Sequence, residues 1–328
     1  MPGVFGHVGC GEDLEKRLRK AVEAVWSDVQ WAQLPRGLLG GHSHFGKALW
    51  EPSPRIRIAV DGSSAIYQSP SQVDSSRCAG NVVKADTVNG GVTLKCDPSG
   101  SFPLFFSYVG EGLVFSSLQR ILAKAVGSPG LDLTGCIENM RFGSTFLGRS
   151  CFRGISRLLP GQTLVFNLES GSRITEASPF WSEKNTPPVK GAAREVWEAL
   201  LEAATSAIPS SDDIALMMSA GWDSRTLLAI LKELNLGSRF RCYTHGDLES
   251  REVRLAERIC GNWGIEHVRE PIDDRIFHEK LIRESFQRTE CSIFPHWHRA
   301  GAVLAGMGVT TAVSGVYGGV LGGHYGAP

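Results

Sequence analysis

The sequence predicts two domains, an α+β domain rich in antiparallel sheet followed by an α/β domain with a doubly wound parallel sheet. Before residue 185, short apolar runs are separated by Gly, Pro, Asp and Ser, which is typical of antiparallel strands. The run SEKNTPPVKGAAREV combines two prolines with mixed charge and indicates a linker over residues 185–192. After it, strand-like and helix-like segments alternate, which favours a parallel sheet. We therefore expect domains over residues 1–184 and 193–328.

The apolar runs of the first domain define its expected strands. They lie at residues 56–60, 91–95, 104–109, 113–116 and 163–168. Residues 40–47 are expected to form a loop, as are residues 209–213 in the second domain.

The second domain is expected to open with a helix over residues 193–208. The elements expected next are, in order, a strand at 214–218, a helix at 226–236, a strand at 240–244, a helix at 252–263 and a strand near 266–269. Repeated strand–helix–strand units of this length imply parallel strands, and ligands gather at the carboxyl ends of such strands. The loop at residues 219–224, which follows the first of these strands, is therefore expected to face a ligand.

Composition excludes several classes of partner. The net charge is zero, so no basic excess favours nucleic acid. The eight cysteines form no CxxC pair, which suits a reducing cytoplasm better than a disulfide scaffold or a zinc site. The N-terminus lacks the order of a signal peptide. Residues 300–328 carry no Asp, Glu, Lys or Arg, but their many glycines favour a buried strand and a Gly-rich loop over a membrane-spanning helix.

The loop at residues 219–224 has the features of an anion site. Backbone N–H groups and the positive end of the following helix would point at the carboxyl edge of the sheet. Small residues let phosphate oxygens approach, the hydroxyls of Ser219 and Ser224 can donate to them, and Asp223 can hold Mg²⁺. The alternative is that Asp223 or Ser224 merely caps the helix. The spacing and lysine of a Walker loop are absent.

Several motifs resemble those of asparagine synthetases and their relatives, among them β-lactam synthetases and lasso-peptide cyclases. SAGWDSRTLLA resembles their pyrophosphate loop, usually SGGxDS. YTHGDLESREVRLAERICGNWGIEH resembles the segment that helps to hold adenosine, and AVSGVYGGVLGG resembles the later SGxGxDxLxGG loop. Upstream, DPSGSFPLFFSYVGEGLVFSSLQRILAKA and ISRLLPGQTLVF resemble parts of the glutaminase-type domain. The resemblance covers nearly the whole chain.

The resemblance implies an Ntn-hydrolase-like αββα sandwich followed by a PP-loop ATP pyrophosphatase domain that is incomplete at its C-terminus. It implies ATP and Mg²⁺ as cofactors and assigns Mg²⁺ to Asp223, while no catalytic residue can be assigned. The residues that it places on ATP or pyrophosphate are Met218, Ser219, Ala220, Gly221, Asp223, Ser224, Thr244, Gly246, Ser314 and Gly315. Family synthetase domains continue past the last motif, so we expect this chain to be a fragment; the alternative is a truncated relative that cannot complete catalysis.

Two departures from the family pattern bear on the chemistry. Pro2 stands where family members have the N-terminal nucleophilic cysteine, so glutaminase activity is expected to be absent, and Cys10 is expected to be a small buried residue. Gly319 stands where the family has a second Mg²⁺-holding aspartate, which leaves Asp223 as the motif acid. Ala220 replaces a glycine, a change that is mild at negative φ and costly otherwise.

We therefore expect an asparagine synthetase-like, AMP-forming amide ligase that adenylates a carboxylate and joins it to an amine, both of unknown identity. The alternatives are a non-catalytic nucleotide-binding or interaction module and an ammonia-dependent asparagine synthase. The protein is expected to be cytoplasmic, with no nucleic-acid or membrane partner, and a homodimer is left open. His296 and His298 would share one face of a strand, but no third metal ligand accompanies them, so a substrate-facing or surface role is favoured.

Overall fold

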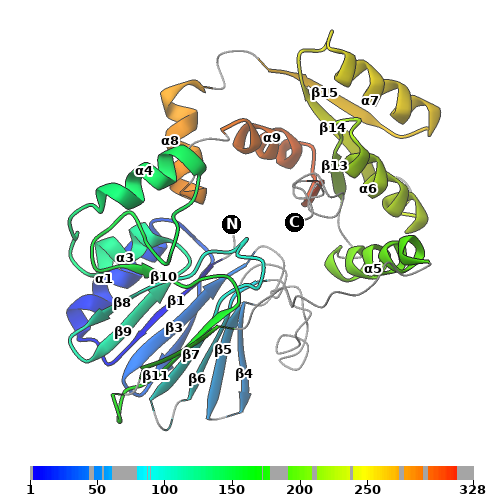
Figure 1. Ribbon diagram of the computed structural model, residues 1–328. Helices are drawn as coiled ribbons and strands as arrows, with labels where there is room; N and C mark the ends of the chain where they lie inside the picture. Colours follow the sequence, from blue (N-terminus) through cyan, green and yellow to red (C-terminus); the bar gives the residue numbers. More distant parts are fainter. Residues whose placement is uncertain are drawn as a thin grey trace. The chain divides into compact units, whose positions relative to one another are not determined.

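A computed structural model of the protein describes most of the chain as two compact units (Figure 1). The first unit is Met1–Lys184 with Phe286–Ile293, and the second is Asn185–Ser285 with Phe294–Pro328. The residues described are 3–43, 48–53, 55–60, 80–86, 88, 90–171, 173–177, 191–208, 213–236, 239–272, 277–290 and 295–315.

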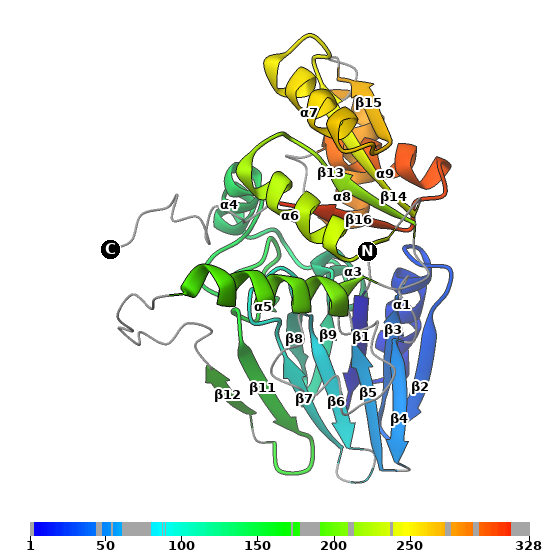
Figure 2. The same cartoon turned by 90° about the vertical axis from the view of Figure 1, so that its right-hand side faces the viewer.

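The first unit is a sandwich of two six-stranded sheets in which neighbouring strands are antiparallel. In Figure 2 the strands of both sheets run in nearly the same direction, as in aligned sheet packing. Sheet A has the order β10-β8-β9-β1-β3-β2, with β1 Gly3–Val8, β2 Gln30–Leu34, β3 Gly37–His42, β8 Phe105–Val109, β9 Gly112–Ser116 and β10 Ser156–Arg157. Sheet B has the order β12-β11-β7-β6-β5-β4, with β4 Leu49–Ser53, β5 Ile56–Val60, β6 Val82–Asp86, β7 Gly91–Lys95, β11 Gln162–Asn167 and β12 Arg173–Ala177.

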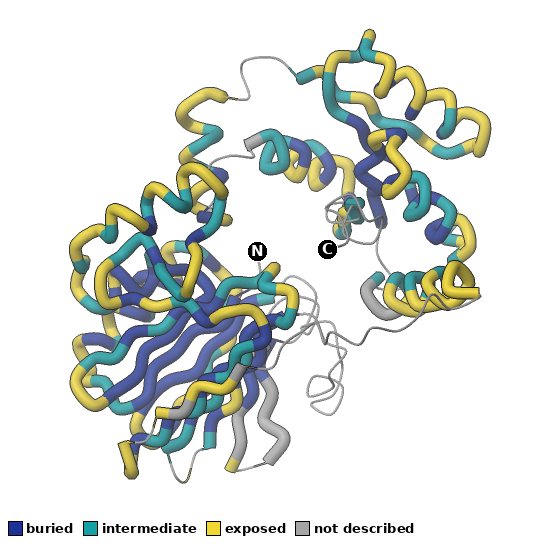
Figure 3. The backbone as a smooth tube through the Cα atoms, viewed as in Figure 1, coloured by how far each residue is buried: buried dark blue, intermediate teal, exposed yellow. Residues whose placement is uncertain are grey.

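Alternation along β1 divides the first unit into two cores. Val4 and Val8 point between the sheets, where they meet Leu94 and Phe166 of sheet B. Phe5, on the opposite face of β1, packs under helices α1 (Glu12–Glu23) and α3 (Gln119–Ala125). Figure 3 shows the buried residues concentrated on these strands. Helix α3 packs on β8 and β9, so a helical layer covers the outer face of sheet A.

The end of helix α8 (Glu279–Thr289) and the residue that follows it, Glu290, belong to the first unit. Glu290 is buried. Its carboxylate accepts hydrogen bonds from the backbone N–H groups of Gln119 (3.0 Å) and Arg120 (2.9 Å) at the start of α3. The α3 helix has no side-chain cap of its own, so Glu290 satisfies N–H groups that would otherwise be unpaired.

All five strands expected in the first unit are present, as β5, β7, β8, β9 and β11. The loop expected at residues 40–47 is wrong at its start, because Gly40 and Gly41 lie inside β3. A Cβ on Gly40 would lie 2.3 Å from the Phe5 ring, so glycine is needed there for close packing and not for a turn. Residues 44–47 lie outside the described part of the chain.

The second unit is built on a four-stranded parallel sheet with helices on both faces (Figure 1). The strand order is β15-β14-β13-β16, with β13 Ile214–Met217, β14 Phe240–Gly246, β15 His267–Pro271 and β16 Thr311–Ser314. Leu216 faces helices α6 (Trp222–Glu233) and α7 (Arg251–Asn262), while Ala215 and Met217 face α9 (Pro295–Gly306). Helix α5 (Ala192–Ala207) precedes the sheet. The predicted doubly wound parallel arrangement is therefore confirmed.

The direction of winding reverses beside β13. The chain steps from β13 to β14 to β15 on one side and then returns to place β16 on the other side of β13. The carboxyl ends of β13 and β16 therefore flank a topological switch point, where crevices form in sheets of this kind.

In the described residues, no helix is both long and apolar enough to cross a membrane.

His296 and His298 lie on α9 and not on a strand. Two residues apart on a helix, they do not share a face. The strand expected within residues 300–328 is present as β16, although its residues are partly exposed and α9 occupies the start of that stretch. Residues 316–328, including Gly319, lie outside the described part of the chain.

Candidate functional site

A cavity of about 520 Å³ lies at the carboxyl edge of the parallel sheet. It is lined by the end of β13 and its loop, the first turns of α6 and α7, the end of β14, one residue of α9 and the loop after β16. The lining residues are Met217, Met218, Ser219, Gly221, Asp223, Ser224, Tyr243, Thr244, His245, Gly246, Asp247, Ser250, Glu252, Val253, Trp297, Ser314 and Gly315. The structure therefore brings every predicted site residue except Ala220 to one cavity, although they come from three separate motifs.

The loop Ser219–Gly221, which we call the β13 loop, connects β13 to α6. Ser224 is buried, and its hydroxyl donates to the carbonyl of Gly221 (3.1 Å) and accepts from the N–H of Ser219 (3.4 Å). Gly221 is the N-cap residue of α6, and no side chain caps the helix. Neither Asp223 nor Ser224 is therefore a helix cap, and the positive end of α6 faces the cavity.

Ala220 occupies the left-handed region of backbone conformation, with φ of 58°. It is also buried, with 7% of its surface exposed. The replacement of the family's glycine by Ala220 is therefore the costly case, because a residue with a Cβ is strained at this positive φ and glycine is not.

We expect Ala220→Gly to stabilise the second unit by about 1 kcal/mol, because it relieves that strain. Ala229→Gly, in the interior of α6, is the matched control and should destabilise by about 1 kcal/mol. Urea unfolding of both variants measures the difference. Equal destabilisation by the two substitutions would show that the Ala220 backbone is not strained.

Gly315, in the loop after β16, lies directly against the first turn of α6. A Cβ at this position would be 2.9 Å from the Cβ of Asp223 and 3.2 Å from the N of Ser224. Glycine is therefore required for the two loops to meet. This close approach is what joins the motif after β13 to the motif after β16.

The hydroxyl of Thr244 is already engaged within the protein. It donates to the carbonyl of Met218 (2.7 Å) and lies 2.8 Å from Nε2 of His267. The backbone N–H of Met218 in turn donates to the carbonyl of Tyr243 (2.8 Å). Thr244 thus lines the cavity, but its hydroxyl holds the chain at the entrance to the β13 loop.

An uncharged wall formed by Tyr243, His245 and Trp297 closes the α9 side of the cavity. Burial and the neighbouring His296, whose ring centroid is 5.2 Å away, lower the pKa of His245 below its usual value. Burial and a hydrogen bond to Glu270 raise the pKa of Tyr243. Both side chains are therefore neutral near pH 7.

Behind this wall, an ion pair joins Glu270 and Arg299, neither of which lines the cavity. Glu270 accepts hydrogen bonds from the Tyr243 hydroxyl and from Nε of Arg299, the latter at 2.7 Å. His298 lies 3.6 Å from Glu284 and takes no part in the wall. His296 contacts His245, which lines the cavity, and the surface or substrate-facing role favoured for the two histidines stays a prediction.

Acidic side chains predominate on the other side of the cavity. Asp223, Asp247 and Glu252 line it, and its described lining contains no Lys or Arg. The described residues hold no group of three or more His, Cys, Asp or Glu side chains that could bind a metal ion by themselves. A polyphosphate in this cavity would therefore need a cation held jointly by protein and phosphate oxygens.

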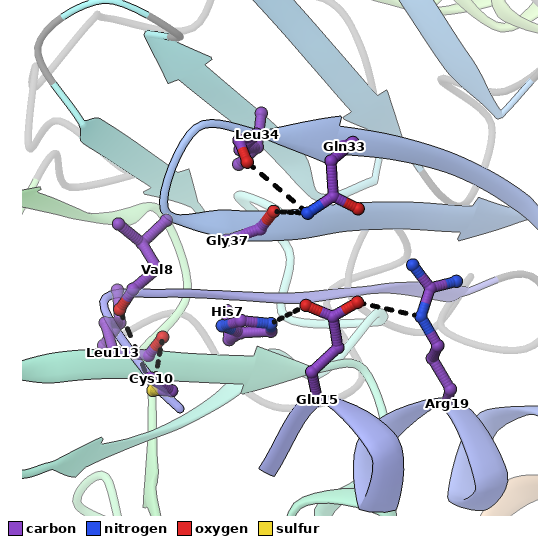
Figure 4. A network of polar contacts seen from close by, with 9 residues as sticks. All are labelled: His7, Val8, Cys10, Glu15, Arg19, Gln33, Leu34, Gly37 and Leu113. Atoms are coloured by element: carbon purple, nitrogen blue, oxygen red, sulfur yellow. Dashed lines mark hydrogen bonds and ion pairs between the residues drawn. The ribbon is translucent and has the colours of Figure 1, made fainter. Parts of the chain in front are cut away.

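Cys10, in the first unit, lacks the properties of a nucleophile. Its Sγ lies 3.8 Å from the carbonyl of Val8 and 3.7 Å from that of Leu113 (Figure 4). Burial raises the pKa of this thiol to about 11, so it is protonated near neutral pH. The nearby polar network of His7, Glu15 and Arg19 does not include it. Pro2 lies outside the described residues.

Sequence reasoning missed five residues of the cavity that carry aromatic or charged side chains. His245 and Asp247 stand at and just after the end of β14, so the rule that ligands gather at strand ends could have found them, whereas Tyr243 lies within the strand. Glu252 lies in the first turn of α7. Trp297 lies on α9, and neither a motif nor a strand end in the sequence marks it as a cavity residue.

Comparison with known proteins identifies no family for this chain. The sequence matches no protein-family profile and no curated protein sequence. Among solved structures it is similar to glutamine phosphoribosylpyrophosphate amidotransferase from B. subtilis complexed with ADP and GMP, with 14% identity, a TM-score of 0.35, and coverage of 85% of this chain and 68% of that one. A structure described as the allosteric regulatory enzyme of purine biosynthesis has 12% identity, a TM-score of 0.35 and coverage of 88% of both chains.

A third similarity is to glutamine-dependent NAD+ synthetase from Acinetobacter baumannii in complex with ADP. It has 16% identity and a TM-score of 0.25, and it covers 44% of this chain and 25% of that one. TM-scores of this size establish neither a shared fold nor a shared function.

Proposed function

We propose that the second unit binds ATP and Mg²⁺ and that the protein is an asparagine synthetase-like, AMP-forming ligase that joins a carboxylate to an amine. The observation that carries the proposal is the meeting of the β13 loop, Asp223 and the Ser314–Gly315 turn at the switch point of the sheet. An uncapped helix N-terminus beside small residues suits phosphate oxygens. The proposal also draws on the order of the three motifs along the chain.

The two sides of the cavity suit the two ends of a nucleotide. The triphosphate would lie against the β13 loop and the first turn of α6. The adenosine would lie against Gly246 and the uncharged wall, where a planar base can stack on or meet edge to face the rings of His245 and Trp297. A cavity of about 520 Å³ is of the size that holds small-molecule ligands.

Mg²⁺ fits the donor set at Asp223. This cation is usually held by one or two carboxylates together with substrate phosphates and water, so a single protein carboxylate is sufficient. It would neutralise phosphate charge in a cavity whose described lining has no cationic side chain.

The proposed reaction has two steps. A carboxylate oxygen attacks the α-phosphorus of ATP, the bond to the β-phosphate bridge breaks and pyrophosphate leaves. The amine nitrogen then attacks the acyl carbon, AMP leaves and the amine loses a proton. The residues described here bind and orient the nucleotide, and we assign no catalytic base. The first unit would be a scaffold without glutaminase activity, which accords with the partly buried, protonated thiol of Cys10.

ATP–pyrophosphate exchange by the full chain tests this proposal. We expect Mg²⁺-dependent exchange with at least one acid from a panel that includes aspartate, aliphatic amino acids and aromatic carboxylic acids. Calorimetry with ATP and Mg²⁺ provides the second arm. Binding without exchange would indicate the non-catalytic nucleotide-binding module, whereas the absence of binding would refute both interpretations. Asparagine formation from aspartate and ammonium would indicate the ammonia-dependent synthase.

A further inference from the structure

A relay of three residues crosses the parallel sheet immediately before the β13 loop. It runs from His267 at the start of β15, through Thr244 on β14, to the carbonyl of Met218 at the end of β13. Its two links measure 2.8 Å and 2.7 Å, which are short, well-formed hydrogen-bond distances. Thr244 and Met218 are both at least 95% buried, so water does not compete for these links.

The direction of each link follows from chemistry. A carbonyl can only accept, so the single proton of the Thr244 hydroxyl goes to Met218. Thr244 then accepts from His267, whose Nε2 must carry a proton. Burial and the nearby Arg269 lower the pKa of His267, which favours the neutral ring. His267 is therefore the Nε2–H tautomer, with a bare Nδ1 that is buried and makes no hydrogen bond within the described part of the chain.

The relay holds Met218, the residue immediately before the β13 loop. The N–H of Met218 is held by the carbonyl of Tyr243, and its carbonyl is held by Thr244, so both backbone groups are anchored to β14. The next peptides must pass through the strained left-handed conformation of Ala220. A strained backbone conformation persists only where surrounding contacts hold it. The hydrogen bond from Thr244 to the Met218 carbonyl is such a contact, on the side of the loop that joins the sheet.

We infer that Thr244 and His267 are positioning residues, which hold the Met218 carbonyl and thereby aim the N–H groups of the β13 loop into the cavity. The inference rests on the proposed function for its effect on nucleotide binding. It also changes the role expected for Thr244 from the sequence, since the hydroxyl orients the loop that would hold phosphate and does not itself contact phosphate.

The test compares two substitutions at one position with a matched control. Thr244→Val keeps the shape and removes the hydroxyl, whereas Thr244→Ser keeps the hydroxyl. Thr205→Val is the control, because the Thr205 hydroxyl also donates to a backbone carbonyl, that of Leu201, at 2.7 Å, but on α5. For ATP with Mg²⁺, calorimetry should show a Kd raised about tenfold in Thr244→Val, which corresponds to about 1.4 kcal/mol. Thr244→Ser and Thr205→Val should stay within about threefold of the unaltered chain.

Nuclear magnetic resonance of the full chain supplies a readout that does not depend on a nucleotide. Long-range ¹⁵N–¹H spectra should show His267 as the Nε2–H tautomer in the unaltered chain and in Thr244→Ser, with this preference lost in Thr244→Val. The amides of residues 219–221 should shift in Thr244→Val and not in Thr205→Val.

The outcomes separate this inference from the proposed function. An Nδ1–H tautomer in the unaltered chain, or unshifted loop amides in a folded Thr244→Val, would overturn the inference. Normal ATP binding by Thr244→Val would also overturn it while leaving the proposed function intact. If the unaltered chain binds no ATP, the proposed function and the predicted effect on binding both fail, and the amide shifts alone decide whether the relay positions the loop.

Discussion

Asp223→Asn is expected to lower Mg²⁺-dependent ATP–pyrophosphate exchange by at least about 100-fold, equivalent to about 2.7 kcal/mol of transition-state stabilisation. The cavity has no cationic side chain in its described lining, so the cation is the proposed means of neutralising the phosphates. Asp223 stands in the first turn of α6 beside Gly315, where the two loops meet. Asparagine keeps the shape and hydrogen-bonding capacity of the side chain but removes the charge that binds Mg²⁺.

The control for this prediction is Glu249→Gln, which makes the same charge change at an exposed position outside the cavity. It should leave exchange within about twofold of the unaltered protein. Raising the Mg²⁺ concentration should partly restore Asp223→Asn if the defect is in cation binding. Full activity of Asp223→Asn at low Mg²⁺ would exclude the assignment of the cation to this residue.

Glu290→Ala is expected to destabilise the first unit by about 3 kcal/mol at pH 5. The substitution leaves two N–H groups at the start of α3 without their acceptor, and at pH 5 this loss does not depend on an ion pair with Arg120, because the carboxyl is then protonated. The Arg120 side chain donates to the carbonyl of Gln287, in the last turn of α8. Urea unfolding followed by tryptophan fluorescence measures the loss.

The stabilising effect of Glu290 should fall as the pH rises. Burial raises the pKa of this carboxyl to about 7, although the two N–H groups and Arg120 act in the opposite direction. A carboxyl whose pKa is raised in the folded state binds its proton more tightly there, so its contribution is complete below the unfolded pKa, near 4.5, and is lost as the pH approaches 7. The loss between these values is on the order of 3 kcal/mol.

Glu290→Gln provides the matched variant for the pH effect, because it resembles the protonated carboxyl and cannot ionise. Because the amide nitrogen cannot accept from the second N–H group, this variant should be less stable than the unaltered protein at pH 5, and the difference should shrink by pH 8 as Glu290 ionises. Parallel pH profiles for the two proteins between pH 5 and 8 would contradict the raised pKa. Glu138→Gln serves as a control, since it changes a carboxylate that is paired with Arg149 elsewhere in the same unit.

Local patterns predicted much of the architecture. The five strands expected in the first unit form because each is a run of apolar residues bounded by turn residues. The alternation in the second unit predicted the parallel sheet and placed the β13 loop at its carboxyl edge. Strands β1 and β3 were missed because each contains more than one glycine, and glycine in a sequence indicates a turn more often than close packing.

Omissions arose where the structure depends on distant contacts. No element was predicted for the segment around His296, and packing of Ala300 and Leu304 on the sheet stabilises α9 there. The contact between Glu290 and α3 joins residues about 170 positions apart, and no local pattern reports such a pairing.

By itself, the sequence determined which residues follow each strand of the parallel sheet, and therefore which side chains can reach its carboxyl edge, because strand order along the chain and side-chain type are local properties. Its resemblance to asparagine synthetase-like proteins stays a prediction, as does the nucleotide. Only the tertiary structure decided that Ala220 has a left-handed backbone conformation, that Gly315 lies against α6, and that the Thr244 hydroxyl donates to the carbonyl of Met218. These three features depend on the distance between β13, β14 and β16, which is set by pairing between strands that are remote in sequence.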